Sequence, residues 1–210
     1  MNHVVLLGDS VFDNSAYVDR GKDVFSLLSR RLPTGWKATL SAVDGSCVRD
    51  VADQVKDLPP DATHLIVSVG GNDALGHGDF LAQRASSVSE VLNRLSVIAE
   101  MFEKEYNELV EEILHQRMPL ALCTVYRPFF PDPDHGRAAL TALAMFNDAV
   151  IRTAFARKAF LIDLRLVCIE PSDFTHTIEP SETGGEKITR HLACFLREWE
   201  KRPDPSGFFR

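Results

Sequence analysis

Five short apolar runs alternate along the chain with longer segments whose apolar residues recur at helical spacing. The apolar runs lie at residues 4–7, 37–43, 65–69, 119–125 and 159–164. The helical segments lie at residues 24–32, 48–57, 88–116, 137–157 and 184–198. Nearly continuous apolar runs are typical of strands buried on both faces, and their alternation with helices predicts parallel pairing through crossovers. We therefore expect an α/β protein, built as a three-layer α/β/α sandwich around a five-stranded parallel sheet.

The length of 210 residues, with 45% hydrophobic residues, suits one domain with a sizeable core. We expect a single domain over residues 1–200 and a short C-terminal tail over residues 201–210. The net charge of −7 disfavours nucleic acid as a partner, because phosphates would be repelled. No apolar run approaches the ~18 residues typical of a membrane span, and the first residues carry no leader pattern. These features predict a cytoplasmic protein without a membrane span.

Glycines and polar residues follow three successive strand candidates. Gly8-Asp9-Ser10 follows the first run, Gly45 the second, and Gly70-Gly71-Asn72-Asp73 the third. In a parallel sheet the carboxyl ends of the strands meet at one edge, where helix N-terminal amides also gather. Each block alone would suit an ordinary strand-to-helix turn, but together they indicate a site that presents a serine hydroxyl.

These blocks resemble those of the SGNH (GDSL-type) hydrolase family. The flanking residues 11–14, 42–44 and 68–75 extend the likeness. The resemblance implies a flavodoxin-like SGNH hydrolase fold with Ser10 as the nucleophile. It also implies an oxyanion hole made by the backbone N–H groups of Ser10 and Gly45 and the side chain of Asn72. That assignment agrees with the chemistry of acyl transfer, which needs donors aimed at an oxygen that becomes negative in the transition state.

The last block allows two registers. The family closes with Asp-x-x-His followed at once by Pro, a small polar residue and a nearby glycine. Here Asp173 and His176 have that internal spacing, but the Pro-Ser-x-x-Gly pattern comes three residues later, at 180–184, directly after Glu179. A neutral imidazole with a pKa near ~6.5 is a better base at neutral pH than a carboxylate near ~4.3. In the first register His176 is the general base and Asp173 orients it, and this is the one we expect. In the second register Glu179 is the alternative base, in the place of the histidine, and His176 takes the place of the aspartate.

The resemblance implies a serine esterase or acylhydrolase that cleaves carboxylic esters of small or soluble substrates through an acyl-serine intermediate. Two alternatives stay open: a non-catalytic binding protein, if Glu179 replaces the base, and an acyltransferase that uses the same residues. The expected substrate contacts are Asp9, His77, Tyr126, Arg127 and Phe129. No His or Cys pattern has metal-ligand spacing, so we expect neither a metal nor a cofactor. The long helical segment at 88–116 and the C-terminal tail are compatible with a homodimer, but the sequence does not require one.

Overall fold

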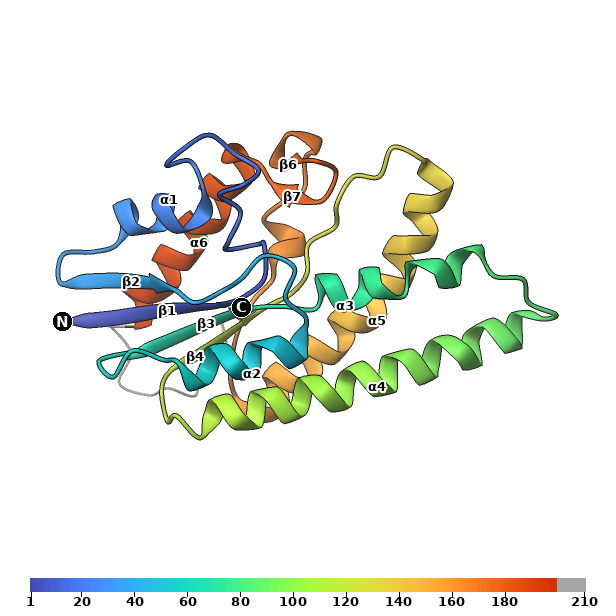
Figure 1. Cartoon of the computed structure of the whole chain (residues 1–210), viewed down its shortest axis with the longest axis horizontal. Coiled ribbons are helices and arrows are strands. Elements are labelled where there is room, and N and C mark those ends of the chain that lie inside the picture. The colour runs from blue at the N-terminus through green and yellow to red at the C-terminus, as the bar shows by residue number, and fades with distance from the viewer. Residues whose placement is uncertain (200–210) are drawn as a thin grey trace.

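A computed structural model describes residues 1–199, which form an α/β fold around a parallel sheet (Figure 1). The five strands of this sheet are β1 (Asn2–Gly8), β2 (Trp36–Leu40), β3 (His64–Ser68), β4 (Leu120–Cys123) and β5 (Phe160–Ile162). They lie in the order β2-β1-β3-β4-β5, and every neighbouring pair is parallel. The expected five-stranded parallel sheet is therefore confirmed. The predicted tail, residues 201–210, lies outside the described residues.

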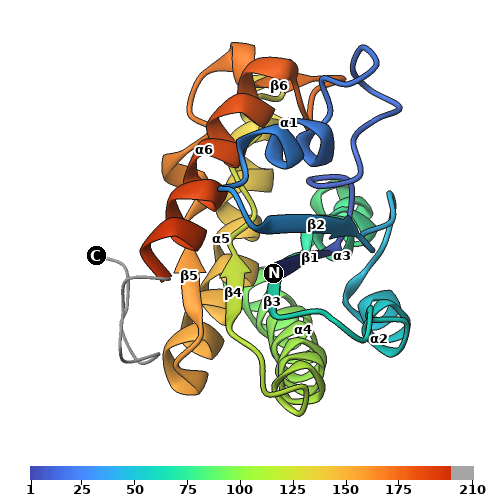
Figure 2. The same cartoon turned by 90° about the vertical axis from the view of Figure 1, so that its left-hand side faces the viewer.

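Helices cover both faces of the sheet and complete the predicted sandwich (Figure 2). On one face lie α1 (Val24–Arg31) and α6 (Glu182–Trp199), which pack on Val4 and Leu6 of β1. On the other lie α2 (Val48–Lys56), α4 (Val88–Leu114) and α5 (Pro133–Arg157), which pack on Val5 and Leu7. Successive side chains of a strand point to opposite faces, so one uninterrupted apolar run supplies both cores.

Local capping sets where the two long helices begin. Ser87 precedes α4, and its hydroxyl accepts a hydrogen bond from the backbone N–H of Glu90 at 3.1 Å. Asp132 precedes α5 and accepts from the backbone N–H groups of Asp134 and His135, while Pro133 takes the first helical position. Proline suits that position because its missing N–H would lack a partner there anyway. This cap starts α5 four residues earlier than the apolar periodicity indicates.

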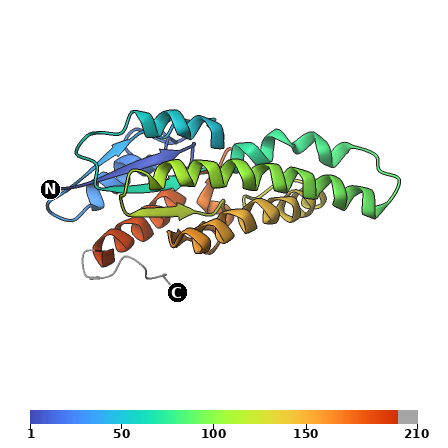
Figure 3. The same cartoon turned by 90° about the horizontal axis from the view of Figure 1, so that it is seen from below.

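Several short elements were not predicted. Helix α3 (Gly71–Gly76) and the 3-10 turn η1 (Gly78–Ala82) follow β3 and lie alongside α4 and α5 beyond the sheet (Figure 3). After β5 come the turns η2 (Leu164–Leu166) and η3 (Pro171–Asp173), then a small antiparallel hairpin. Its strands are β6 (Phe174–Thr175) and β7 (Glu179–Pro180). Elements this short contain too few residues for a hydrophobic periodicity that would predict them. Nevertheless, α3 and the hairpin carry residues of the candidate site.

Within the described residues, α5 is the one helix whose length and composition would allow it to cross a membrane. It has 25 residues and a mean hydropathy of 1.2 over the relevant window, of which 39% is buried inside the fold. Leu143, Phe146 and Val150 of this helix pack in the core on the α2–α4–α5 face. A core helix passes the same test of length and composition, so these values do not make α5 a membrane span.

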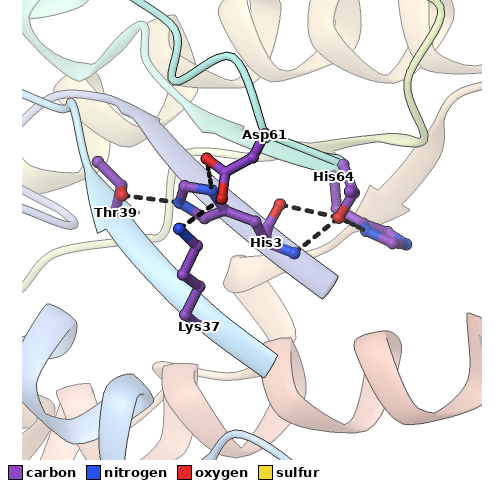
Figure 4. A network of polar contacts seen from close by, with 6 residues as sticks. His3, Lys37, Thr39, Asp61 and His64 are labelled. Carbon is purple, nitrogen blue, oxygen red and sulfur yellow. Dashed lines mark hydrogen bonds and ion pairs between the residues drawn. The ribbon is translucent and has the colours of Figure 1, made fainter. Parts of the chain in front are cut away.

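A polar network ties the first strand to its surroundings at the amino end of the sheet (Figure 4). His3 is 2% exposed, and its ring nitrogens lie 2.9 Å from an Asp61 carboxylate oxygen and 2.7 Å from the Thr39 hydroxyl. Asp61 also pairs with Lys37 of β2, at 2.5 Å. The network joins β1, β2 and the segment before β3 at the edge opposite the strand ends that carry Ser10. It stabilises the sheet and does not belong to the candidate site.

Candidate active site

Ser10 sits in the turn directly after β1, and the packing of that strand end fixes its position. Gly8 has φ 127°, and a Cβ atom placed there would lie 1.8 Å from the carbonyl oxygen of Ser68. Only glycine permits this approach, which also lets the backbone N–H of Asp9 donate to the same carbonyl at 3.1 Å. Ser10 is 9% exposed, so its hydroxyl is held at the edge of the sheet and not on a mobile loop.

Two buried amide side chains hydrogen-bond to the backbone at the ends of the strands beside Ser10. The sequence pattern did not predict them as part of the site. Gln54 of α2 accepts from the N–H of Gly8 and donates to its carbonyl, both at 2.8 Å. Asn147 of α5 makes the same pair of bonds to Val125, at 2.8 and 2.9 Å. Both amides stand on the apolar faces of their helices. A polar residue on the apolar face of a predicted helix is the sequence feature that indicates such a role, because a buried polar group needs a hydrogen-bond partner.

The predicted oxyanion donors lie in two neighbouring turns. Asn72 is in the first turn of α3, and its side-chain Nδ2 donates to the carbonyl of Ser46 at 3.0 Å. That bond uses one of the two N–H donors of the amide and leaves the other for a ligand. Gly45, with φ 81°, precedes Ser46 in an exposed turn. Asn72 and Ser10 both line one cavity, whereas Gly45 stands next to the residue that holds Asn72 and does not line the cavity.

That cavity has a volume of about 130 Å³, and most of the side chains that line it away from Ser10 are apolar. The polar end contains Asp9, Ser10, Asn72 and Glu179. The apolar walls come from α3, η1, α4, α5 and the segment after β4, and include Ala74, Leu81, Leu95, Ile98, Val125, Pro128, Phe130, Leu143 and Phe146. Of the expected substrate contacts, Asp9, His77 and Tyr126 line the cavity. Arg127 and Phe129 do not: both are exposed, and Phe129 packs near the ring of Phe174 at 6.1 Å.

Glu179 is the carboxylate that shares the polar end of the cavity with Ser10. It belongs to β7 and is 7% exposed. Burial raises its pKa and the charge of Asp44 adds to that, whereas the Ser10 hydroxyl, acting as a hydrogen-bond donor, and nearby His176 lower it. Its Oε2 atom is buried and has no hydrogen-bond partner among residues 1–199. One oxygen of this carboxyl group is therefore buried without a polar partner, which disfavours the charged form.

Asp9 is a second buried carboxyl at the same end. It is 3% exposed, and burial is the main cause that raises its pKa from 3.8 to about 7. The charges of Glu179 and Asp73 raise it further, while a hydrogen bond from the backbone N–H of Val11, at 3.1 Å, opposes them. At neutral pH a large share of Asp9 is therefore uncharged.

The structure does not bring Asp173 and His176 together with Ser10. Asp173 is fully buried, and its Oδ2 accepts from the backbone N–H groups of Ile169 and Glu170, both at 3.0 Å, and from Lys187 at 2.7 Å. These donors occupy the carboxylate that the first register assigns to an imidazole. His176 is exposed in the turn between β6 and β7 with φ 46°, and its ring centroid lies 5.7 Å from that of Tyr17. Of the two registers, the geometry favours the one with Glu179 beside the serine.

Two buried side chains hold the segment that carries Glu179. The Tyr126 hydroxyl donates to the carbonyl of Ile178 at 2.7 Å, so its polar atom serves the fold although its ring lines the cavity. Asn14 is fully buried and donates through Nδ2 to the carbonyl of Pro180 at 2.9 Å. The residues on either side of Glu179 are thus each anchored by a hydrogen bond.

No group of three or more His, Cys, Asp or Glu side chains within residues 1–199 is arranged to hold a metal ion. The polar end of the cavity offers two carboxyls, a hydroxyl and an amide. Such a set suits proton transfer and the binding of a carbonyl oxygen.

The model of the GDSL-like lipase/acylhydrolase family matches residues 6–186 of the chain. An extracellular lipase from Streptomyces rimosus superimposes with a TM-score of 0.69 at 15% identity, over 94% of this chain and 99% of that one. An acetyl xylan esterase gives 0.70 at 16% identity, over 92% and 99%. A psychrotrophic esterase from Pseudoalteromonas gives 0.64 at 13% identity, over 96% and 100%. Among curated proteins, none matches the sequence.

Proposed function

The chain belongs to the GDSL-like lipase/acylhydrolase family, and from that premise we propose that it is a serine esterase with Ser10 as its nucleophile. The observation that carries this proposal is the pairing of the Ser10 hydroxyl with the buried carboxyl of Glu179 at the polar end of an apolar cavity. A hydroxyl beside a base, next to a space that takes an apolar group, suits attack on the carbonyl of a carboxylic ester.

In the first half of the reaction Glu179 accepts the proton of the Ser10 hydroxyl while the serine oxygen attacks the ester carbonyl. An exposed carboxylate is a weak base for this step, and the raised pKa of Glu179 strengthens it. The oxygen of the tetrahedral intermediate becomes negative and is stabilised by the backbone N–H group of Ser10 and the free N–H of Asn72, the two predicted donors that line the cavity. Protonated Glu179 then gives its proton to the departing alcohol, which leaves an acyl group on Ser10.

In the second half a water molecule takes the place of the alcohol. Glu179 accepts a proton from this water, whose oxygen attacks the acyl carbonyl. As the bond from the acyl carbon to the Ser10 oxygen breaks, Glu179 returns the proton to that oxygen, so the carboxylic acid leaves and the Ser10 hydroxyl is restored. The same residues would deliver the acyl group to another alcohol if water were excluded, so transferase activity is a variant of this proposal.

A non-catalytic binding protein is the alternative, because the side chain paired with Ser10 is a carboxyl group, which is a weaker base than an imidazole. Hydrolysis of p-nitrophenyl acetate and butyrate separates the two functions. We expect turnover by the wild type, none by Ser10→Ala, and a loss of about 10²-fold or more in Glu179→Gln, which keeps the shape but cannot accept the proton. His176→Ala is the matched control and should stay within about threefold of the wild type.

Other outcomes would contradict the proposal in different ways. Full turnover by Ser10→Ala would rule out the serine nucleophile. Loss of turnover in His176→Ala, with Glu179→Gln unaffected, would show that His176 is the general base, as in the first register. If the wild type turns over neither ester, labelling with a fluorophosphonate, which reacts with activated serines, decides the question. The absence of label on Ser10 would favour the binding protein.

A further inference from the structure

The cavity extends from Ser10 well past the reacting atoms. From Ser10 and Asn72 it runs between two walls that lie beyond the sheet. One wall is made by α3, η1 and α4, with Ala74, Leu81 and Leu95 among its residues, and the other by α5 and the segment before it. A group that entered along this path would leave its carbonyl at Ser10 and bury its remaining atoms against apolar side chains.

The size of this space limits what it holds. A dry cavity of about 150 Å³ accepts benzene, a molecule of six carbons. A volume of about 130 Å³ therefore matches a chain of about four to six carbons or one aromatic ring. Acetyl groups would leave most of it empty, and long fatty-acyl chains would exceed it.

The charge of the site adds a second limit. Asp9 and Glu179 stand at the polar end, and both have raised pKa values because they are buried. An anionic group there would meet two carboxyls in a site of low polarity. The other titratable side chains of the lining are His77 and His135, which are exposed, and Tyr126, whose hydroxyl donates to the Ile178 carbonyl. The walls near Ser10 thus favour an uncharged, apolar group.

Small residues on α5 keep the space open. Ala139 and Ala142 line it on the same face as Leu143 and Phe146. Ala144, two positions further along, is exposed and does not line the cavity. A larger side chain at position 142 would occupy part of this space from α5, which carries none of Ser10, Asn72 and Glu179.

We propose that this cavity is the acyl subsite of the esterase, selective for uncharged apolar acyl groups of about four to six carbons or a single ring, with Ala142 as a residue that sets its length. The inference rests on the proposed function, because it takes Ser10 as the point where the ester carbonyl is held.

A series of p-nitrophenyl esters from acetate to decanoate tests the subsite. Each buried methylene is expected to raise kcat/KM about fourfold, so butyrate should exceed acetate on the order of tenfold. The values should stop rising near hexanoate. Ala142→Phe should remove this preference and make acetate the best substrate, whereas the matched control Ala144→Phe should keep the wild-type profile. If the Phe variant does not fold, Ala142→Val should shift the optimum in the same direction by a smaller amount.

Binding of the same esters to Ser10→Ala, measured by calorimetry, provides a readout without catalysis. Affinity that rises to hexanoate and is lost in Ser10→Ala/Ala142→Phe supports the subsite even if the wild type hydrolyses nothing, in which case only the proposed function fails. A kcat/KM that is independent of chain length, with turnover that depends on Ser10, overturns the subsite and leaves the esterase. Equal effects of Ala142→Phe and Ala144→Phe would also overturn it.

Discussion

Replacing Asp9 by asparagine should stabilise the protein at neutral and alkaline pH. Asp9 is 3% exposed and lies beside Ser10, where charging its carboxyl is costly. Asparagine has nearly the same shape, and its side-chain oxygen can still accept the hydrogen bond from the N–H of Val11. The substitution therefore removes the charge and leaves packing and bonding nearly unchanged.

The size of the effect follows from the pKa of Asp9, which is 3.8 ordinarily and about 7 in the fold. At 1.36 kcal/mol for each pKa unit, this difference corresponds to ~4 kcal/mol. The native state holds the proton more tightly than the unfolded state, so the contribution of Asp9 to stability is fully present below pH 3.8 and is lost as the pH rises through about 7. Above that pH the loss is complete and constant.

Urea unfolding from about pH 5 to about pH 8 measures the effect. The stability of Asp9→Asn relative to the wild type should grow by about 2–3 kcal/mol over this range, because part of the loss already occurs below pH 5. Asp19→Asn is the matched control, since the side chain of Asp19 is 83% exposed and should show no such growth.

Parallel stability profiles for the wild type and Asp9→Asn would refute the reasoning, since they would mean that Asp9 titrates alike in the folded and unfolded states. A variant that is less stable at every pH would refute it differently, by showing that the carboxylate is needed as an acceptor. Burial would then not be the main determinant of how Asp9 affects stability.

Two further predictions concern the hydrogen bonds that Tyr126 and Lys187 donate. Tyr126→Phe removes the donor to the Ile178 carbonyl and should lower kcat about tenfold with KM nearly unchanged; steady-state kinetics checks this, and a change in KM alone would contradict a positioning role. Lys187→Met leaves the buried Asp173 carboxylate without its cation and should cost about 2–3 kcal/mol in urea unfolding; His176→Ala should cost almost nothing, and equal losses would mean that His176 shares in holding Asp173.

The sheet could be predicted because buried parallel strands are continuous apolar runs, and each expected run overlaps an observed strand. The run at residues 4–7 lies within Asn2–Gly8, and the run at 65–69 overlaps His64–Ser68. The positions of Ser10 and Asn72 could be predicted for the same reason, because both follow such runs. They meet at the cavity since parallel strands end at one edge.

The partners of these residues could not be predicted, because they come from elements without periodicity or from single polar residues on apolar faces. Gln54 reaches Gly8 from α2, which is 46 residues away in the sequence. Asn14 reaches the carbonyl of Pro180, which is 166 residues away. Contacts of this kind depend on the completed packing and not on any local preference.

The same limit applies to the spacing of Asp173 and His176, because neither residue lines the cavity that holds Ser10. The Pro-Ser-x-x-Gly pattern comes three residues late, and the turn between β6 and β7 contains three residues, 176–178. His176 and Thr177 adopt positive φ values of 46° and 76° in that turn, and Thr175 pairs with Glu179 across it. The extra residues thus form an outward loop that carries His176 to the surface, and the chain returns at Glu179. Directly before Pro180, where the family resemblance places an imidazole, the cavity is lined instead by the carboxyl group of Glu179, whose pKa is raised by its burial.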